Sequence, residues 1–166
     1  MSSELAHPIK AILFVCTGNS CRSVMAEQLA AKLIRDADYP IEVDSAGTMR
    51  GGGLTASPET RVVLRRDDID ASEHLSKPLS QDLLDKADLV CVMTKGHYQI
   101  IADSFPEAVI KTRILAEFYE GEYASQMGDG IPDPIGMGQV FYDRVYGVIQ
   151  NSLKNMFQSI EAGAQK

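Results

Sequence analysis

The feature that most constrains the fold of this 166-residue chain is a short, mostly apolar run that ends in a polar, glycine-containing turn. The segment Ile9–Val15 reads IKAILFV, which is typical of a buried strand, and Cys16–Ser23 after it reads CTGNSCRS. Apolar residues then recur every four positions over Met25–Leu33, which predicts an amphipathic helix ending near Asp36. Strand, turn and helix in this order place the turn at the carboxyl end of a strand, where parallel sheets bind ligands.

Strand-like and helix-like segments continue to alternate along the chain. Further strands are predicted at Ile41–Ala46, Leu89–Met93 and Val109–Leu115. Helices are predicted from Pro58 to about Asp68, and at Ser80–Lys86, Gly96–Asp103 and Phe141–Ile160. We therefore expect an α/β fold with a parallel sheet covered by helices on both faces. The length suits a single domain, which we place at residues 9–162 after a short N-terminal tail at residues 1–8.

Composition narrows the class of protein. No apolar stretch approaches the length of a membrane span, so we expect no membrane partner. Three irregularly spaced cysteines do not make a disulfide framework, which favours a reducing, cytoplasmic location. A net charge of −7 argues against nucleic acid as a partner. The histidines His7, His74 and His97 lack metal-ligand spacing, so we expect no metal and no cofactor.

The Cys16–Ser23 segment has the composition of an oxyanion site. Backbone N–H groups in such a turn, with the following helix N-terminus, attract an anion. The same field and the nearby Arg22 favour the thiolate of Cys16, the nucleophilic form, over a plain packing role for that cysteine. Arg22 suits bidentate binding of phosphate oxygens, although a surface charge is the alternative. The other residues predicted to bind phosphate are Thr17, Gly18, Asn19, Ser20, Cys21 and Ser23.

Two further side chains could take part in a reaction in which Cys16 is the nucleophile. Ser23 either caps the helix or donates its hydroxyl to the Cys16 sulfur. Asp133, in Ile131-Pro132-Asp133-Pro134, is held by flanking prolines and is our candidate general acid. A position that is partly buried and close to a bound dianion would favour its protonated form. The alternative for Asp133 is a turn-forming Asp-Pro pair.

Four motifs, in order along the chain, resemble the low-molecular-weight protein-tyrosine phosphatases. They are CTGNSCRS, DSAGT at Asp44–Thr48, ADLVCVMT at Ala87–Thr94, and Asp133-Pro134. The resemblance implies a four-stranded parallel sheet and a metal-free, two-step reaction on a phosphorylated protein. In it, Cys16 attacks phosphorus and Asp133 serves first as acid and then as base. It also implies that Asn19 and Ser45 brace the loop. Cys21 either packs or forms a reversible disulfide with Cys16.

Two departures from the family pattern leave the substrate open. Many family members carry aromatic residues after the Asp-Pro pair, whereas Ile135, Gly136 and Met137 follow here. A bulky aliphatic residue is common at the position of Ser20, and a small hydroxyl residue there resembles the protein-arginine phosphatase branch, which has threonine. We therefore expect phosphotyrosine as the substrate, because it is the usual substrate of the family that the chain resembles, with phosphoarginine as the alternative.

Two less favoured functions remain. Thioredoxin-coupled arsenate reductases share the loop, but they also carry two relay cysteines just after the third strand. This chain has only Cys91 in that region, within the strand, which favours a core role for that residue. An inactive oxyanion-binding module is the other alternative, and it would not need the acid Asp133.

Overall fold

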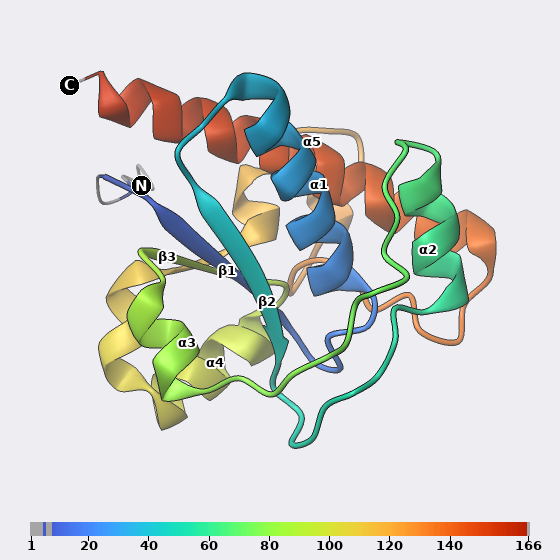
Figure 1. The fold of residues 1–166 in the computed structure, drawn as a ribbon, viewed down its shortest axis with the longest axis horizontal. Helices are drawn as coiled ribbons and strands as arrows, with labels where there is room; N and C mark the ends of the chain where they lie inside the picture. The colour runs from blue at the N-terminus through green and yellow to red at the C-terminus, as the bar shows by residue number, and fades with distance from the viewer. Residues whose placement is uncertain (1–4, 6–7, 166) are drawn as a thin grey trace.

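Four parallel strands form one sheet in the order β2-β1-β3-β4 (Figure 1). The computed structural model describes residue 5 and residues 8–165. The strands are β1 (Ala11–Cys16), β2 (Glu42–Gly47), β3 (Leu89–Val92) and β4 (Thr112–Ile114). In the register, Val15 lies opposite Ala46 of β2 and Val92 of β3, so the three strands end together beside Cys16. The predicted four-stranded α/β architecture is confirmed.

Helices cover both faces of the sheet (Figure 1). The α-helices are α1 (Arg22–Ala37), α2 (Pro58–Arg65), α3 (Gln81–Lys86), α4 (Lys95–Ser104) and α5 (Gln139–Ala164). Three short 3-10 helices are η1 (Pro106–Lys111), η2 (Leu115–Phe118) and η3 (Ala124–Gln126). Helices α1 and α5 lie on one face of the sheet, and α3 and α4 lie on the other. Among the described residues, none of these helices has the length and apolarity needed to cross a bilayer.

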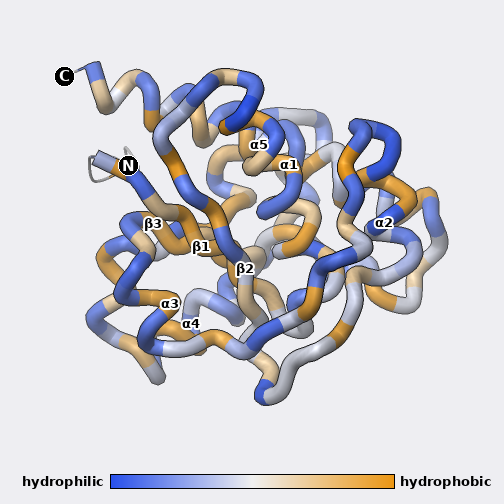
Figure 2. The backbone as a smooth tube through the Cα atoms, in the orientation of Figure 1, coloured by the Kyte–Doolittle hydropathy of each residue, from blue (hydrophilic) through white to orange (hydrophobic). Residues whose placement is uncertain are grey.

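The central strand β1 is apolar throughout because both of its sides are buried. Ile12 and Phe14 point into the cluster with α1 and α5, whereas Leu13 and Val15 point into the cluster with α3 and α4. Side chains alternate between the faces of a sheet, so a strand covered twice needs no polar side. Figure 2 shows the hydrophobic residues gathered along the central strands.

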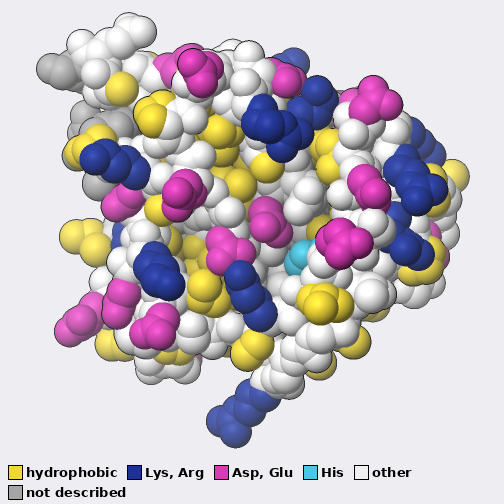
Figure 3. Space-filling view, in the orientation of Figure 1, with side chains coloured by type: hydrophobic (Ala, Val, Ile, Leu, Met, Phe, Trp, Pro, Cys, Tyr) yellow, Lys and Arg dark blue, Asp and Glu magenta, His cyan; other side chains and the backbone are white. Residues whose placement is uncertain are grey.

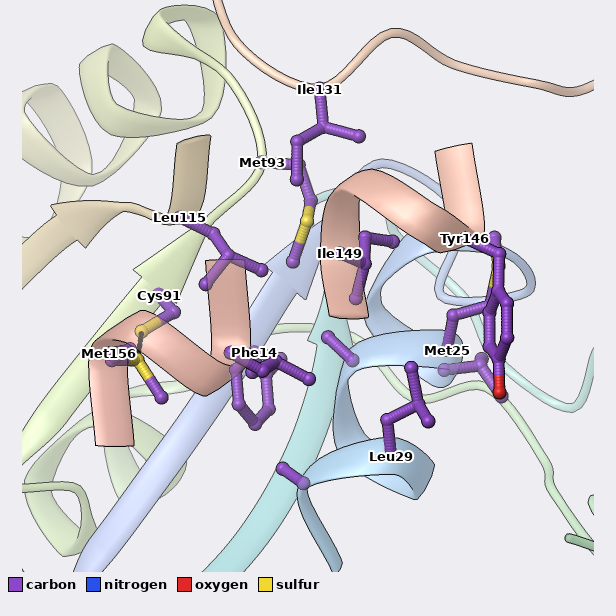
Figure 4. Close-up of a cluster of buried hydrophobic side chains, with 14 of the residues drawn as sticks. Phe14, Met25, Leu29, Cys91, Met93, Leu115, Ile131, Tyr146, Ile149 and Met156 are labelled. Atoms are coloured by element: carbon purple, nitrogen blue, oxygen red, sulfur yellow. Dashed lines mark hydrogen bonds between the residues drawn. The ribbon is translucent and has the colours of Figure 1, made fainter. Parts of the chain in front are cut away.

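The larger core lies between the sheet and α5. Figure 4 shows Phe14 of β1 facing Ile149 and Met156 of α5, and Met25 of α1 beside Tyr146 of α5. Ile131, in the loop before α5, points toward Met93 at the end of β3. Burial of such side chains contributes roughly 1.5–3 kcal/mol each relative to leaving them exposed. This core therefore fixes the loop that leads to Asp133 as well as the helices.

Two predicted elements are shorter than expected. Only Thr112–Ile114 of the predicted strand Val109–Leu115 pairs with β3, because Pro106 begins a 3-10 helix that takes up the residues before it. Ile110 is 84% exposed there, so its apolar character does not mark a buried strand. The predicted helix after Pro58 ends at Arg65 rather than Asp68, which adopts a positive φ of 58°.

Candidate active site

The loop between β1 and α1 turns its carbonyl groups outward. The four carbonyls of Cys16, Thr17, Asn19 and Ser20 accept hydrogen bonds from Thr48 N, Met49 N, His74 Nε2 and Ser57 N, respectively, at 2.7–3.0 Å. Carbonyls held on the outside leave the amide groups of the loop for an anion on the inside. Helix α1 also begins without a side-chain cap, so no side chain takes the N–H groups of its first turn. The segment therefore has the build of an oxyanion cradle.

Cys16 is the last residue of β1, and its sulfur is buried beside the first turn of α1. Its Sγ lies 3.0 Å from the Ser23 hydroxyl oxygen. Asn19 Nδ2 donates to that oxygen at 2.8 Å, which leaves the Ser23 hydroxyl hydrogen free to point at sulfur. Of the two roles weighed for Ser23, the geometry supports donation to Cys16, because α1 has no side-chain cap.

Asn19 is the centre of the loop's internal hydrogen bonds. Its Nδ2 also donates to Ser45 Oγ at 2.9 Å, and its Oδ1 accepts from the Lys77 backbone N–H at 3.1 Å. Asn19 adopts a φ of 53°, a left-handed conformation that asparagine tolerates better than most residues. Three strong bonds from one buried amide hold the loop in a single shape.

Behind Asn19 lies a polar cluster that joins the predicted bracing residue Ser45 to Glu27, a residue that the sequence did not point to. Ser45 donates onward to Glu27 Oε2 at 2.5 Å, and Lys77 Nζ contacts both carboxylate oxygens of Asp44 at 2.6 and 2.7 Å. Burial raises the pKa of Glu27, and the hydrogen bond from Ser45 opposes that shift. The cluster thus supports the bracing of the loop from the side of β2.

Arg22 is the first residue of α1, and only 4% of its side chain is exposed. Its Nη1 donates to the carbonyl oxygen of Ile131 at 2.9 Å, and its Nη2 lies 3.5 Å from Asp133 Oδ2. A buried guanidinium held in this way is not a free surface charge. It joins the loop after β1 to the loop before α5.

Asp133 faces the same small pocket as Cys16. The pocket is lined by Cys16, Gly18, Ser20, Cys21, Arg22, Asp133 and Ile135. Asp133 Oδ1 accepts from the Ile135 backbone N–H at 3.1 Å, which fixes the carboxyl within its own turn. The Asp133 side chain is 45% exposed, and Pro132 before it is exposed as well. Asp133 is therefore more open to solvent than the partly buried position that the sequence predicted.

Cys21 lines the same pocket as Cys16, and its side chain contacts α5. Its Sγ lies 3.4 Å from Ser57 Oγ and 3.4 Å from the Tyr142 hydroxyl of α5. Burial raises the pKa of Tyr142 to about 12, so this hydroxyl is neutral at ordinary pH. All three cysteines are free thiols, and the disulfide between Cys16 and Cys21 stays a prediction.

Comparison with known proteins places this site in a family. A family model described as low molecular weight phosphotyrosine protein phosphatase matches residues 11–166. The chain belongs to this phosphatase family. A curated protein-arginine-phosphatase from Geobacillus stearothermophilus is 42% identical over 127 residues, which cover 75% of this chain and 78% of that protein.

Both branches of the phosphatase family are represented among the relatives. The low molecular weight protein-tyrosine-phosphatase Ptp of Acinetobacter johnsonii is 34% identical over 152 residues, covering 91% of this chain and 98% of that protein. The crystal structure of a low molecular weight protein tyrosine phosphatase from T. tengcongensis has a TM-score of 0.81 at 31% identity. That match covers 90% of this chain and 98% of that one.

The phosphatase fold brings every predicted site residue to one edge of the sheet. The loop residues and Ser45 arrive together because β1 and β2 are neighbours, and Asp133 joins them through Arg22. Sequence reasoning missed Glu27, His74 and His97, since each reaches the loop through a contact between distant segments. For His97, a local signal was available: Thr94 lies three residues before it, which is the spacing of a helix N-cap and the residue it bonds.

The third cysteine lies in the core of this phosphatase, as predicted. Cys91 is fully buried in β3 with its Sγ 3.5 Å from Met156 Sδ, and burial raises its pKa. It does not line the pocket, which argues against Cys91 as a redox relay for the arsenate reductase alternative. Within the described residues, no cluster of three or more His, Cys, Asp or Glu side chains is arranged to hold a metal, and His7 lies outside those residues.

Proposed function

We propose that this protein is a cysteine-dependent phosphoprotein phosphatase that forms a cysteinyl-phosphate intermediate. The observation that carries the proposal is the shared pocket, where Cys16, Arg22 and Asp133 all contribute lining atoms. A binding module for oxyanions would use the loop and Arg22, but it would have no use for an acid beside the nucleophile. The family membership supports the same conclusion.

In the first step, the Cys16 sulfur attacks phosphorus and the bond from phosphorus to the leaving atom breaks. Asp133 gives its proton to that leaving atom, so the side chain does not depart as an anion. The loop amides and Arg22 hold the phosphoryl oxygens during transfer. The Ser23 hydroxyl, 3.0 Å from the sulfur, stabilises Cys16 as a thiolate before attack.

In the second step, Asp133 takes a proton from a water molecule, which attacks the phosphorus of the cysteinyl phosphate. The phosphorus–sulfur bond breaks, inorganic phosphate leaves and Cys16 returns to the thiolate. Ser23 supports the leaving sulfur in this step with the same hydrogen bond. No metal enters either step.

Phosphotyrosine is the first candidate substrate, because the family description and the Acinetobacter relative name that activity. Phosphoarginine is the second candidate, favoured by the pocket lining. Ser20 and Ile135 stand at the pocket, and neither supplies the aromatic wall that stacks on a tyrosine ring. The Geobacillus relative is named a protein-arginine-phosphatase, which supports this candidate.

The proposed mechanism is tested by replacing the nucleophile. Cys16→Ser is expected to lower turnover by at least about a thousandfold, because an alcohol is a far weaker nucleophile than a thiolate. Inorganic phosphate should still bind, since the loop amides and Arg22 remain. The matched control is Cys91→Ala, which removes a thiol outside the pocket and should leave turnover within a few fold. Retained turnover in Cys16→Ser would refute the mechanism.

The substrate is tested by measuring kcat/KM side by side on phosphotyrosine and phosphoarginine peptides of one sequence. A third arm with arsenate and a thioredoxin system checks the reductase alternative. Preference for one peptide by more than about tenfold assigns the substrate. Turnover of neither peptide, with phosphate still bound, would favour the inactive binding module.

A further inference from the structure

His97, in the first turn of α4, lies against the loop that holds the nucleophile, and only 5% of it is exposed. Its Nε2 lies 2.8 Å from Thr17 Oγ1, and its Nδ1 lies 3.0 Å from Thr94 Oγ1. Both ring nitrogens are therefore engaged, one on each side of the ring. This buried imidazole has no part in the two steps described above.

The hydrogen-bond network favours one tautomer of the ring. Thr94 Oγ1 accepts the backbone N–H of His97 at 3.3 Å as the cap of α4, so its own hydrogen is available for Nδ1. In the tautomer that this bond favours, Nε2 carries the ring hydrogen and donates it to Thr17. Burial and the nearby Arg22 lower the pKa of His97 to about 4, which keeps the ring neutral and this arrangement intact.

The segment Met93–His97 also holds the loop that carries Asp133. Met93 O accepts from Ile131 N at 2.9 Å, and Lys95 N donates to Asp129 O at 2.8 Å. Thr94 and Gly130 form an antiparallel bridge between these two bonds. Figure 4 shows the Ile131 side chain pointing toward Met93, so backbone and side chain fix the same two segments together.

One short segment thus contacts both of the loops that line the pocket. It contacts the nucleophile loop through His97 and Thr17, and it contacts the acid loop through Met93, Thr94 and Lys95. The charges of Arg22 and Asp133 also act on the pKa of His97, in opposite directions. Arg22 makes a separate connection through Ile131 O.

We propose that His97 is a positioning residue that ties the Cys16 loop to the segment holding Asp133 and so sets the separation between nucleophile and acid. This inference rests on the proposed function, because it needs Asp133 to act as the acid. Proton transfer requires heavy-atom distances of about 2.6–3.2 Å. A misplacement of about 1 Å costs on the order of a hundredfold in rate. Loss of the His97 bond therefore affects the step that uses the acid more than it affects phosphate binding.

The test is a double-mutant cycle between His97 and Asp133 with two leaving groups. His97→Phe keeps a ring of similar size and removes both hydrogen bonds. It should lower kcat about tenfold or more on phenyl phosphate, a poor leaving group, and much less on p-nitrophenyl phosphate. In the Asp133→Ala background, His97→Phe should change kcat on phenyl phosphate by less than about twofold. Inhibition by inorganic phosphate should stay within about twofold throughout.

Three further variants separate positioning from a general loss of structure. His97→Gln retains a donor for Thr17 and should recover most of the lost rate. Thr17→Val removes the same hydrogen bond from the other side and should show the same coupling, even if His97→Phe does not fold. His74→Phe is the matched control, because His74 bonds the loop at Asn19 O, away from α4. It should lower the rates on both substrates by the same factor.

Two results would overturn the inference. Equal losses on both substrates, additive with Asp133→Ala, would make His97 a structural residue and leave the proposed function standing. If Asp133→Ala itself affects both leaving groups equally, the acid role fails, and the proposed function and this inference fail with it.

Discussion

The guanidinium of Arg22 lies 3.5 Å from the Asp133 carboxylate while it donates to the carbonyl of Ile131, two residues before that aspartate. One side chain thus connects the proposed phosphate-binding group to the loop of the proposed acid. Because Arg22 is buried, its geometry is set by these contacts rather than by solvent. Binding of phosphate and placement of the acid are therefore linked through this residue.

Arg22→Lys tests that link while keeping the positive charge. A lysine has one ammonium group and lacks the planar fork needed to hold phosphate and Ile131 O together. We expect the inhibition constant of inorganic phosphate to rise by at least about tenfold, and kcat to fall as well, measured by steady-state kinetics. Arg66→Lys is the control, since Arg66 pairs with Asp143 between α2 and α5. An unchanged phosphate affinity would show that Arg22 acts by charge alone.

Asn19 should matter for stability as well as for activity. Asn19→Ala removes three hydrogen bonds from a buried amide and leaves a positive φ on alanine, so we expect a loss of about 2–4 kcal/mol in the free energy of unfolding. Asn19→Gly tolerates the φ and should recover about 1 kcal/mol of that loss in urea titrations. Asp38→Ala, at a positive φ on the surface, is the control and should leave turnover unchanged.

Local features of the fold could be predicted from the sequence, whereas contacts between distant segments could not. The run Ile9–Val15 and the turn after it predicted the sheet and the loop, because burial and turn chemistry are local signals. The contact of His97 with Thr17 spans 80 positions, and that of Ser45 with Glu27 needs β2 packed beside α1. Such contacts follow from tertiary packing, which no local pattern encodes.

The exposure and arrangement of surface residues also could not be predicted from the sequence. Ile110 is apolar but exposed, and it made the predicted fourth strand too long at its start. On the face shown in Figure 3, acidic and basic side chains are interspersed over β2 and α1. Net charge does not reveal such an arrangement, so the expected absence of a nucleic-acid partner stays a prediction.

Gly130 should tolerate no side chain, because it approaches the end of β3 closely. A Cβ at this position would lie 2.2 Å from Met93 O, and the φ of 133° disfavours any other residue. We expect Gly130→Ala to lower the free energy of unfolding by about 2–4 kcal/mol and to lower kcat, since the clash displaces the loop before Asp133. Gly136→Ala is the matched control, with a φ of 75° but open space around the new methyl group. Equal losses in both variants would show that backbone strain alone is responsible.

The buried imidazole of His97 makes stability depend on pH. In the unfolded chain its pKa is about 6.5, and in the folded protein burial and Arg22 lower that pKa to about 4. Between these values the unfolded state binds a proton that the folded state does not, so stability falls as pH drops from 6.5 to 4. This contribution is at most about 3 kcal/mol.

Urea titrations at pH 4, 5, 6 and 7 measure this contribution. His97→Gln has no titrating ring, so its free energy of unfolding should fall less over this range than that of the unmodified protein. His74→Gln serves as the control for loss of a histidine elsewhere around the loop. A His97→Gln curve parallel to that of the unmodified protein would contradict the assignment of a neutral, buried ring.

Ser20 lines the pocket, and we expect this side chain to decide the choice of substrate. It is buried, and its Oγ lies 3.7 Å from Cys21 Sγ. Ser20→Ile replaces a small hydroxyl by a branched apolar chain, which packs against an aromatic ring and leaves a guanidinium without a polar neighbour. We expect the ratio of kcat/KM for phosphotyrosine over phosphoarginine peptides to rise by about tenfold or more. Ser20→Thr keeps the hydroxyl and should leave the ratio nearly unchanged, whereas an unchanged ratio in Ser20→Ile would mean that this position does not select the substrate.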